Sequence, residues 1–208
     1  MNFYQKTGSG SDLNDSLKTF IIFERIIASV CILIPVILKL YDKSCSHFRY
    51  SISKYAYMTN SYIYGMLLCM AAMLFIFNGA IYFKSEVHLL LDKNGKWYNV
   101  GLGVSLIGVI LFPPLKYHLI HLIFGTIFFI GNAFVIGFFQ KKNRIVGITL
   151  AVLTVVAFIL SLATCLFTLL WAEWISLATI GTHFFLEAKN AIISNTIDNG
   201  HQKVDNQT

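Results

Sequence analysis

Charge is scarce in this sequence. Only 12% of its 208 residues are Asp, Glu, Lys or Arg, whereas 56% are hydrophobic. A soluble domain carries about 25% charged residues, so this chain lacks the polar surface that a soluble globule of its size needs. The hydrophobic residues gather in runs, and a run of roughly 18 or more residues can cross a ~30 Å hydrocarbon layer as a helix. The sequence therefore predicts an integral membrane protein.

Several motifs are also missing. The four cysteines have no CxxC spacing, and three of them (Cys31, Cys69 and Cys165) lie inside apolar runs, which argues against a disulfide framework or a zinc knuckle. No Walker loop, Rossmann glycine set, GxSxG or HExxH is present. The net charge is +6, but the cations lie in the breaks between apolar runs and form no stripe for nucleic acid. We therefore expect no nucleic-acid partner, no cofactor and no resident metal.

The apolar runs predict an all-α fold, a polytopic bundle of six transmembrane helices over residues 20–189. The expected helices cover about 20–40, 61–83, 98–112, 119–139, 145–169 and 171–188. The last two come from one apolar stretch, Ile145 to Ala188, which is too long for one crossing and which we divide near Leu170 to Glu173. Residues 1–19 and 190–208 are polar and are expected to be tails, the second one disordered.

Lys and Arg are distributed unevenly between the two sides. With the N-terminus inside, eleven of them fall on the cytoplasmic side and five on the other. Cytoplasmic loops are enriched in Lys and Arg. The sequence therefore predicts an N-in, C-in, multi-pass protein with both termini in the cytoplasm.

A tyrosine-rich loop separates the first two predicted helices, in the segment FRYSISKYAYMTNSYIYG. Tyr62 and Tyr64 fall at the start of the second helix, where an aromatic belt at headgroup depth explains them. Arg49, Ser51, Ser53 and Tyr55 come before it and carry polar atoms that a belt does not need. We predict that these four residues bind a ligand or a partner.

Four polar residues within or beside apolar runs are further candidates: His118, His121, His183 and Glu173. An ionisable group at membrane depth is a functional hypothesis by default, although Glu173 is also explained as a marker of the outer interface between Trp171 and Trp174. His118 and His121 are spaced i, i+3 and could share a metal, with His183, Glu173 or His47 as a third ligand. Two interfacial histidines after a Pro-Pro turn explain the same pair, so we assign no catalytic or metal residue.

The order of some features resembles a known group. These features are FERI at the start of the first helix, an R-x-S-I-S-x-Y segment before the second, a histidine-led fourth helix and WAEWI near the last. The chain resembles an uncharacterised bacterial group of six-span membrane proteins, distantly similar to the DRAM-like (damage-regulated autophagy modulator) family. The resemblance implies a fold, a topology and a bacterial inner-membrane location, and it implies no reaction.

Three functions are open at this point. The first is a non-enzymatic membrane protein that binds a lipid, a hydrophobic ligand or a protein partner through the loop between helices one and two. The second is an oligomeric, membrane-perturbing or pore-forming effector of a bacterial defence or stress system. The third is an intramembrane metal-dependent hydrolase built on His118, His121 and His183.

Overall fold

The computed structural model describes residues 10–84, 97–139, 143–164 and 167–205, and side chains over most of this range. These residues form six α-helices and one 3-10 helix, with no strand among them. The elements are α1 (Gly10–Tyr41), η1 (Ile52–Tyr57), α2 (Ser61–Lys84), α4 (Tyr98–Leu111), α5 (His118–Phe139), α6 (Arg144–Ala163) and α7 (Leu169–Asp205). The first nine residues and the segment with Lys93 and Lys96 lie outside the described residues.

Five of these helices are long and apolar enough to cross a membrane, through α1, α2, α5, α6 and α7. The sixth, α4, has 14 residues and is about 21 Å long at roughly 1.5 Å per residue. Large apolar side chains face outward on α5 and α6, where Leu119, Val152 and Leu162 are exposed. Such a surface suits lipid and not water, and the chain is an all-α membrane bundle, as its composition predicts.

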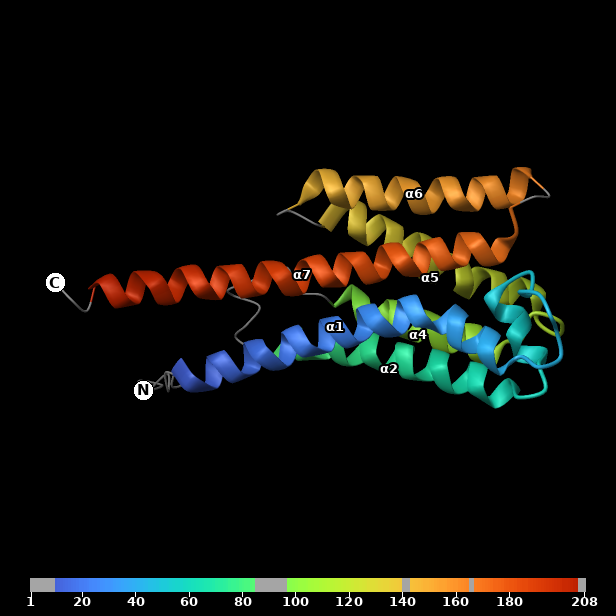
Figure 1. Cartoon of the computed structure of the whole chain (residues 1–208), viewed down its shortest axis with the longest axis horizontal. Helices are drawn as coiled ribbons and strands as arrows, with labels where there is room; N and C mark the ends of the chain where they lie inside the picture. The colour runs from blue at the N-terminus through green and yellow to red at the C-terminus, as the bar shows by residue number, and fades with distance from the viewer. Residues whose placement is uncertain (1–9, 85–96, 140–142, 165–166, 206–208) are drawn as a thin grey trace, which may run out of the picture.

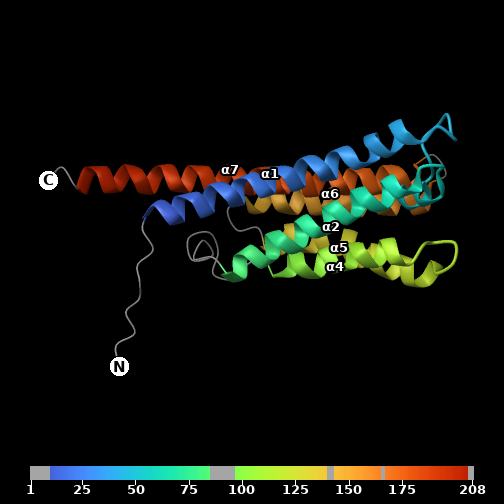
Figure 2. The same cartoon turned by 90° about the horizontal axis from the view of Figure 1, so that it is seen from below.

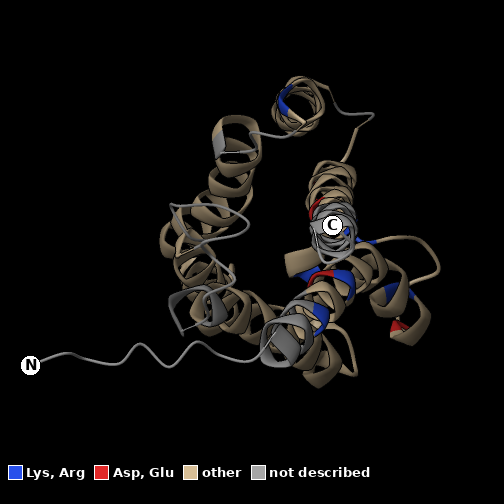
Figure 3. Ribbon diagram, turned by 90° about the vertical axis from the view of Figure 1, so that its left-hand side faces the viewer, with Lys and Arg blue, Asp and Glu red and all other residues tan. Residues whose placement is uncertain are grey.

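The helices run alternately up and down, so both described ends of the chain lie at the same end of the bundle (Figure 1). The 90° view in Figure 2 shows the same antiparallel arrangement. Each helix packs on the next one along the chain, and α7 returns to pack against α1, which closes a ring. Figure 3 looks along this ring from the end that holds the termini, which we call the terminal end. The opposite end carries η1, and we call it the capped end.

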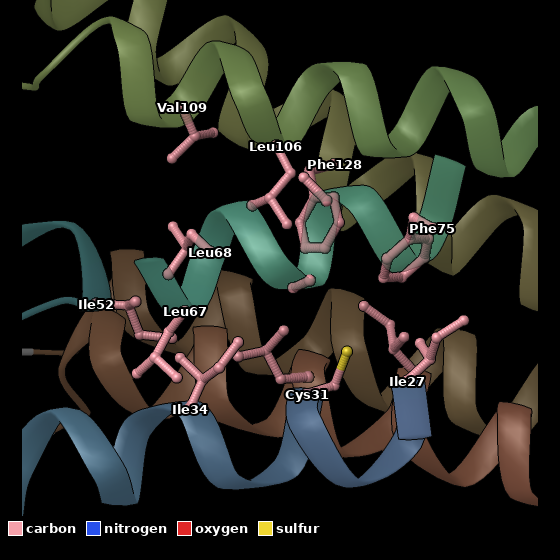
Figure 4. Close-up of a cluster of buried hydrophobic side chains, with 14 of the residues drawn as sticks. Ile27, Cys31, Ile34, Ile52, Leu67, Leu68, Phe75, Leu106, Val109 and Phe128 are labelled. Atoms are coloured by element: carbon pink, nitrogen blue, oxygen red, sulfur yellow. The ribbon is translucent and has the colours of Figure 1, made fainter. Parts of the chain in front are cut away.

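Aromatic side chains fill the interior of the ring. Phe75 on α2 meets Phe128 on α5 and Phe184 on α7 edge to face, with ring centroids 5.6 and 5.5 Å apart. Figure 4 shows Ile27 and Cys31 of α1 pointing toward the same core. Edge-to-face packing is a favoured geometry for aromatic rings, so three non-adjacent helices are held together at the centre.

Three predicted boundaries are wrong. The first helix, which we expected to begin near residue 20, begins at Gly10. The break between the fifth and sixth helices, which we expected near Leu170 to Glu173, lies earlier: α6 ends at Ala163, six residues before the predicted end at 169, and α7 begins at Leu169. The 20 residues of α6 already span about 30 Å, and Thr164 then turns extended at φ −128°, ψ 139°. The C-terminal tail is not disordered from residue 190, because α7 continues to Asp205 with no proline to stop it.

Candidate functional site

The loop after α1 folds back as a cap over the bundle. Its entry is fixed by Asp42, whose carboxylate accepts hydrogen bonds from Arg49 Nε at 2.6 Å and from Ser44 Oγ at 2.5 Å. Arg49 also donates to Ser44 Oγ at 2.9 Å. On the other side of the loop, Lys39 Nζ donates to the carbonyl of Cys45 at 2.7 Å. Arg49 and Lys39 are therefore both engaged in holding the loop in its conformation.

The ionisable groups of the cap respond to this arrangement. The Arg49 guanidinium, by hydrogen bonding, lowers the pKa of Asp42 to about 2 from an ordinary 3.8, although burial opposes the change. The same bond raises the pKa of Arg49 above its ordinary value. Burial raises the pKa of Tyr55. An ion pair of Asp42 and Arg49 therefore persists over the whole physiological range of pH.

The 3-10 helix η1 enters the bundle as a wedge. Ile52 is 5% exposed and Tyr55 is fully buried, and the Tyr55 hydroxyl accepts the backbone N–H of Arg49 at 3.4 Å. A backbone bond from Leu170 N to Tyr50 O, 2.7 Å long, ties the loop to the start of α7. The wedge therefore closes the capped end by burying apolar side chains and by joining the loop to α7.

Aromatic rings secure the same junction. Phe48 of the loop lies 5.9 Å from Trp171 and 5.8 Å from Trp174, measured between ring centroids. The two indoles are stacked at 5.4 Å. These three rings cover the first turns of α7, where Glu173 lies.

Glu173 turns inward beneath the cap. It is 5% exposed, and its Oε2 accepts the backbone N–H of Ile52 at 2.5 Å, across 121 positions of sequence. A cavity of about 30 Å³ lies beside it, and its polar lining comes from Glu173, Ser53, Tyr64 and Cys31. Apolar side chains form the remaining walls, and Figure 4 shows Leu68, Leu106 and Phe128 among them. The Glu173 side chain therefore faces η1 and not water, while its predicted depth at the outer interface stays a prediction.

A polar chain continues from this cavity to α5. Ser53 Oγ lies 2.8 Å from Nε2 of His121, and Nδ1 of His121 lies 2.8 Å from the carbonyl oxygen of Phe112. A carbonyl only accepts, so Nδ1 carries a proton, and in the neutral imidazole Nε2 is then the acceptor. Ser53 therefore donates its hydroxyl proton to His121, and its oxygen lone pairs stay available toward the cavity.

The residues that the sequence singled out fall into two groups. The structure brings Ser53 together with His121, and places Glu173 against η1. It does not bring the histidines together: His118 is exposed at the capped end, and His183 is ten residues beyond Glu173 on α7, about 15 Å along the axis. Among the described residues, no three or more His, Cys, Asp or Glu side chains are grouped so that they could hold a metal ion.

The remaining loop candidates have structural partners. Arg49 pairs with Asp42, Ser51 is 4% exposed, and Tyr55 is fully buried. Whether any of these residues contacts a ligand stays a prediction.

Two residues of this end were not recognised from the sequence. Asp42 fixes the loop, but the segment from Asp42 to Arg49 is not helical, so their spacing in the sequence does not predict the pair. Tyr64 was assigned to the aromatic belt, which is wrong, because it is 4% exposed while Tyr62 is 69% exposed. A spacing of two residues on a helix points side chains about 200° apart, and this difference is the signal that could have separated them.

A second feature lies on the outer side of the bundle. A groove of about 310 Å³ runs between α1 and α2, with apolar walls that include Ile26, Leu33 and Met70, and with Arg25 near the terminal end. Ser29 lies in the middle of the groove and bonds back to its own helix, from Oγ to the Arg25 carbonyl at 2.9 Å. The groove is therefore long, apolar and cationic at one end.

Comparison with known proteins places the chain in a family. No curated protein and no solved structure matches it. A family model described as a family of unknown function, DUF7103, matches residues 33–188, about three quarters of the 208 residues. The match carries no link to the DRAM-like family, so that resemblance stays a prediction. The matched range holds η1, Glu173 and most of the ring of helices, and the chain belongs to the DUF7103 family.

Proposed function

We propose that this protein binds a membrane phospholipid in the groove between α1 and α2, as a non-enzymatic, multi-pass protein of the bacterial inner membrane. The observation that carries the proposal is the combination of an apolar groove of about 310 Å³ with an arginine near one end. Ligand sites commonly have volumes of about 300–1,000 Å³ and mostly apolar walls. An acyl chain and a phosphate group match the two parts of this groove.

The length of the groove supports an acyl chain as its occupant. On α1 the lining runs from Ile22 to Ile37, which corresponds to about 22 Å along the axis. One leaflet is roughly half of a ~30 Å hydrocarbon core, so a lipid chain from one leaflet fits along the groove. The lining side chains Ile26 and Leu33 are 42% and 47% exposed, which leaves them open to such a chain.

Arg25 supports an anionic headgroup. It is exposed on α1 and forms no ion pair with any described residue. A guanidinium donates two parallel hydrogen bonds to a phosphate, and a long side chain can extend from a helix to the headgroup level. An anionic phospholipid is therefore favoured over a zwitterionic one.

The orientation belongs to the same proposal. The predicted distribution, with eleven Lys and Arg residues on the cytoplasmic side and five on the other, supports cytoplasmic termini. Arg25 would then meet lipid headgroups of the cytoplasmic leaflet. The expected partners are the lipid bilayer and, as a competing occupant of the groove, a second copy of the chain.

Native mass spectrometry of the detergent-purified protein tests the proposal. The measured quantity is retention of phosphatidylglycerol and of phosphatidylcholine with the same acyl chains. We expect a preference for phosphatidylglycerol that Arg25→Gln removes, because the substitution leaves the groove intact but takes away the phosphate donor. Ser29→Phe should lower retention of both lipids, because the ring fills the groove.

The chain offers matched controls. Arg144→Gln removes an exposed arginine at the same end but outside the groove. Thr149→Phe adds a ring at an exposed residue that also bonds back four positions, to Ile145 O at 2.9 Å. Both should bind lipid as the unmodified protein does. If Ser29→Phe retains as much lipid as the unmodified protein, the groove is not the lipid site. If the variant changes from dimer to monomer and keeps its lipid, the groove binds a second copy of the chain instead.

The loop remains the competing location, and Arg49→Gln tests it in the same assay. Loss of lipid in this variant, with normal retention in Ser29→Phe, would move the site to the loop. A pore through a single copy has less support, because Phe75, Phe128 and Phe184 fill the interior. The metal-dependent hydrolase gains no support from the separation of His121 and His183 along the bundle.

A further inference from the structure

The cavity beneath η1 holds buried polar groups that the proposed lipid site does not explain. Its volume of about 30 Å³ holds a single water-sized occupant. Such a space excludes a lipid, a nucleotide or an organic ammonium ion. Any occupant is therefore a water, a proton carrier or a small ion.

A negative charge on Glu173 would have no lysine or arginine counterion among the described residues. Arg49 is engaged with Asp42, and Lys39 with loop carbonyls. No described lysine or arginine pairs with Glu173, and its hydrogen bond comes from the neutral N–H of Ile52. Burying a carboxylate without a counterion costs much free energy, so the Glu173 side chain requires either a bound cation or a proton.

The hydroxyl of Tyr64 is a second and independent observation. Tyr64 is 4% exposed and lines the cavity from α2. Its oxygen is buried and meets no described residue in good hydrogen-bonding geometry, and the polar groups near it are Glu173 and Ser53. A buried hydroxyl in this state costs about 1–3 kcal/mol, so an occupant of the cavity would offset that cost.

Three of the four polar groups that line the cavity offer oxygen atoms, and the fourth is the thiol of Cys31. Glu173 offers carboxylate oxygen, Tyr64 offers its hydroxyl, and Ser53 keeps its oxygen lone pairs because its proton goes to His121. Oxygen ligands suit hard cations, and one carboxylate balances one positive charge. The chemistry therefore selects a monovalent metal cation of small radius.

We infer that the cavity formed by Glu173, Tyr64 and Ser53 is a binding site for a sodium ion. The bound ion sits between α2, α7 and η1 and so holds the cap on the bundle. The proton is its competitor for Glu173. The other titratable groups beside the cavity are Cys31 of α1 and, behind Ser53, His121 of α5, while the exposed Tyr57 of η1 lies outside its lining and accepts the Leu115 N–H.

The experiment is binding of radioactive sodium to the purified full chain, at about pH 8.5, with choline chloride holding the ionic strength constant. We expect saturable binding that falls as the pH is lowered, because protons compete for Glu173. Glu173→Gln should abolish saturable binding. Tyr64→Phe, which removes one oxygen and keeps the ring, should weaken the apparent affinity by about tenfold, the effect of roughly one such contact.

Glu187→Gln is the matched control, since it removes a carboxylate near the other end of the membrane span of α7. It should bind sodium as the unmodified protein does. Sodium should also raise the melting temperature of the unmodified protein but not of Glu173→Gln, a comparison that needs only folded starting material. Non-saturable binding, or equal melting temperatures in sodium and in choline, would overturn the inference and leave Glu173 as a protonated, neutral acid.

Discussion

Gly103 on α4 lies where the backbone of α2 comes close, and alanine at this position should destabilise the bundle. A methyl carbon there would lie 2.7 Å from the carbonyl oxygen of Ala72 and 2.6 Å from Cγ1 of Ile76. A relaxed C···O contact is about 3.3 Å, so the two helices must separate by roughly 0.6 Å. Over-packing of this kind costs about 1–3 kcal/mol.

Gly101 provides the internal comparison, because it lies on the same helix and no described atom is within 4 Å of its methyl position. Alanine gains about 1 kcal/mol over glycine in a helix interior, and this gain is common to both variants. The difference between Gly101→Ala and Gly103→Ala therefore isolates the packing cost. We expect Gly101→Ala to be the more stable of the two by about 1–3 kcal/mol.

Thermal unfolding in a mild detergent, followed by circular dichroism, measures this difference. A kcal/mol shifts the melting temperature of a chain of this size by about 2–4 °C, so the two variants should melt several degrees apart. Equal melting temperatures, or a higher one for Gly103→Ala, would refute the close approach of α2 and α4 at this point.

Three further predictions follow from the structure. The Asp42–Arg49 pair should make the free energy of unfolding fall in acid, because the pKa of Asp42 is lowered to about 2 from 3.8. The pair contributes on the order of 2 kcal/mol to that free energy. This contribution is fully present above about pH 4 and is lost as the pH falls toward 2. Unfolding measured between these pH values should show this slope, and Asp42→Asn should flatten it. Thr154→Val should lower the free energy of unfolding by about 0.6 kcal/mol, because it removes a hydrogen bond between α6 and α7. Thr179 donates its proton to Ser176 O and therefore accepts the hydrogen bond from Thr154 at 2.8 Å. A melting temperature equal to that of the unmodified protein would contradict this bond. A fluorescent reporter fused to the C-terminus should be active in the cytoplasm, and a periplasmic reporter active there would contradict the N-in, C-in orientation.

The helices themselves were largely predictable from the sequence. Apolar runs are a direct consequence of the hydrocarbon thickness, so α4 (Tyr98–Leu111) and α5 (His118–Phe139) differ from the predicted ranges by one residue at one end. The boundary at Arg144 was also close, because a charged residue at the end of an apolar run rarely enters lipid.

The capped end was not predictable in the same way. A charge at Glu173 signals a helix end only if the charge faces water, and here it faces η1 instead. Helical periodicity states which residues share a face, but it does not state that residue 52 will insert beside residue 173. That contact depends on the tertiary fold and leaves no pattern in the sequence. For this reason the helix break was predicted in the wrong place and Tyr64 was assigned to the aromatic belt.

The two proposed sites are separated by one helix. Cys31 of α1 lines the cavity beneath the cap, whereas Ser29 lines the outer groove. Two positions on a helix differ by about 200°, so these side chains lie on nearly opposite faces of α1. A ring added at Ser29 therefore grows away from Glu173, and a substitution at Glu173 leaves the groove unchanged. Loss of lipid in Ser29→Phe and loss of sodium in Glu173→Gln are accordingly independent results, and the failure of either proposal leaves the other standing.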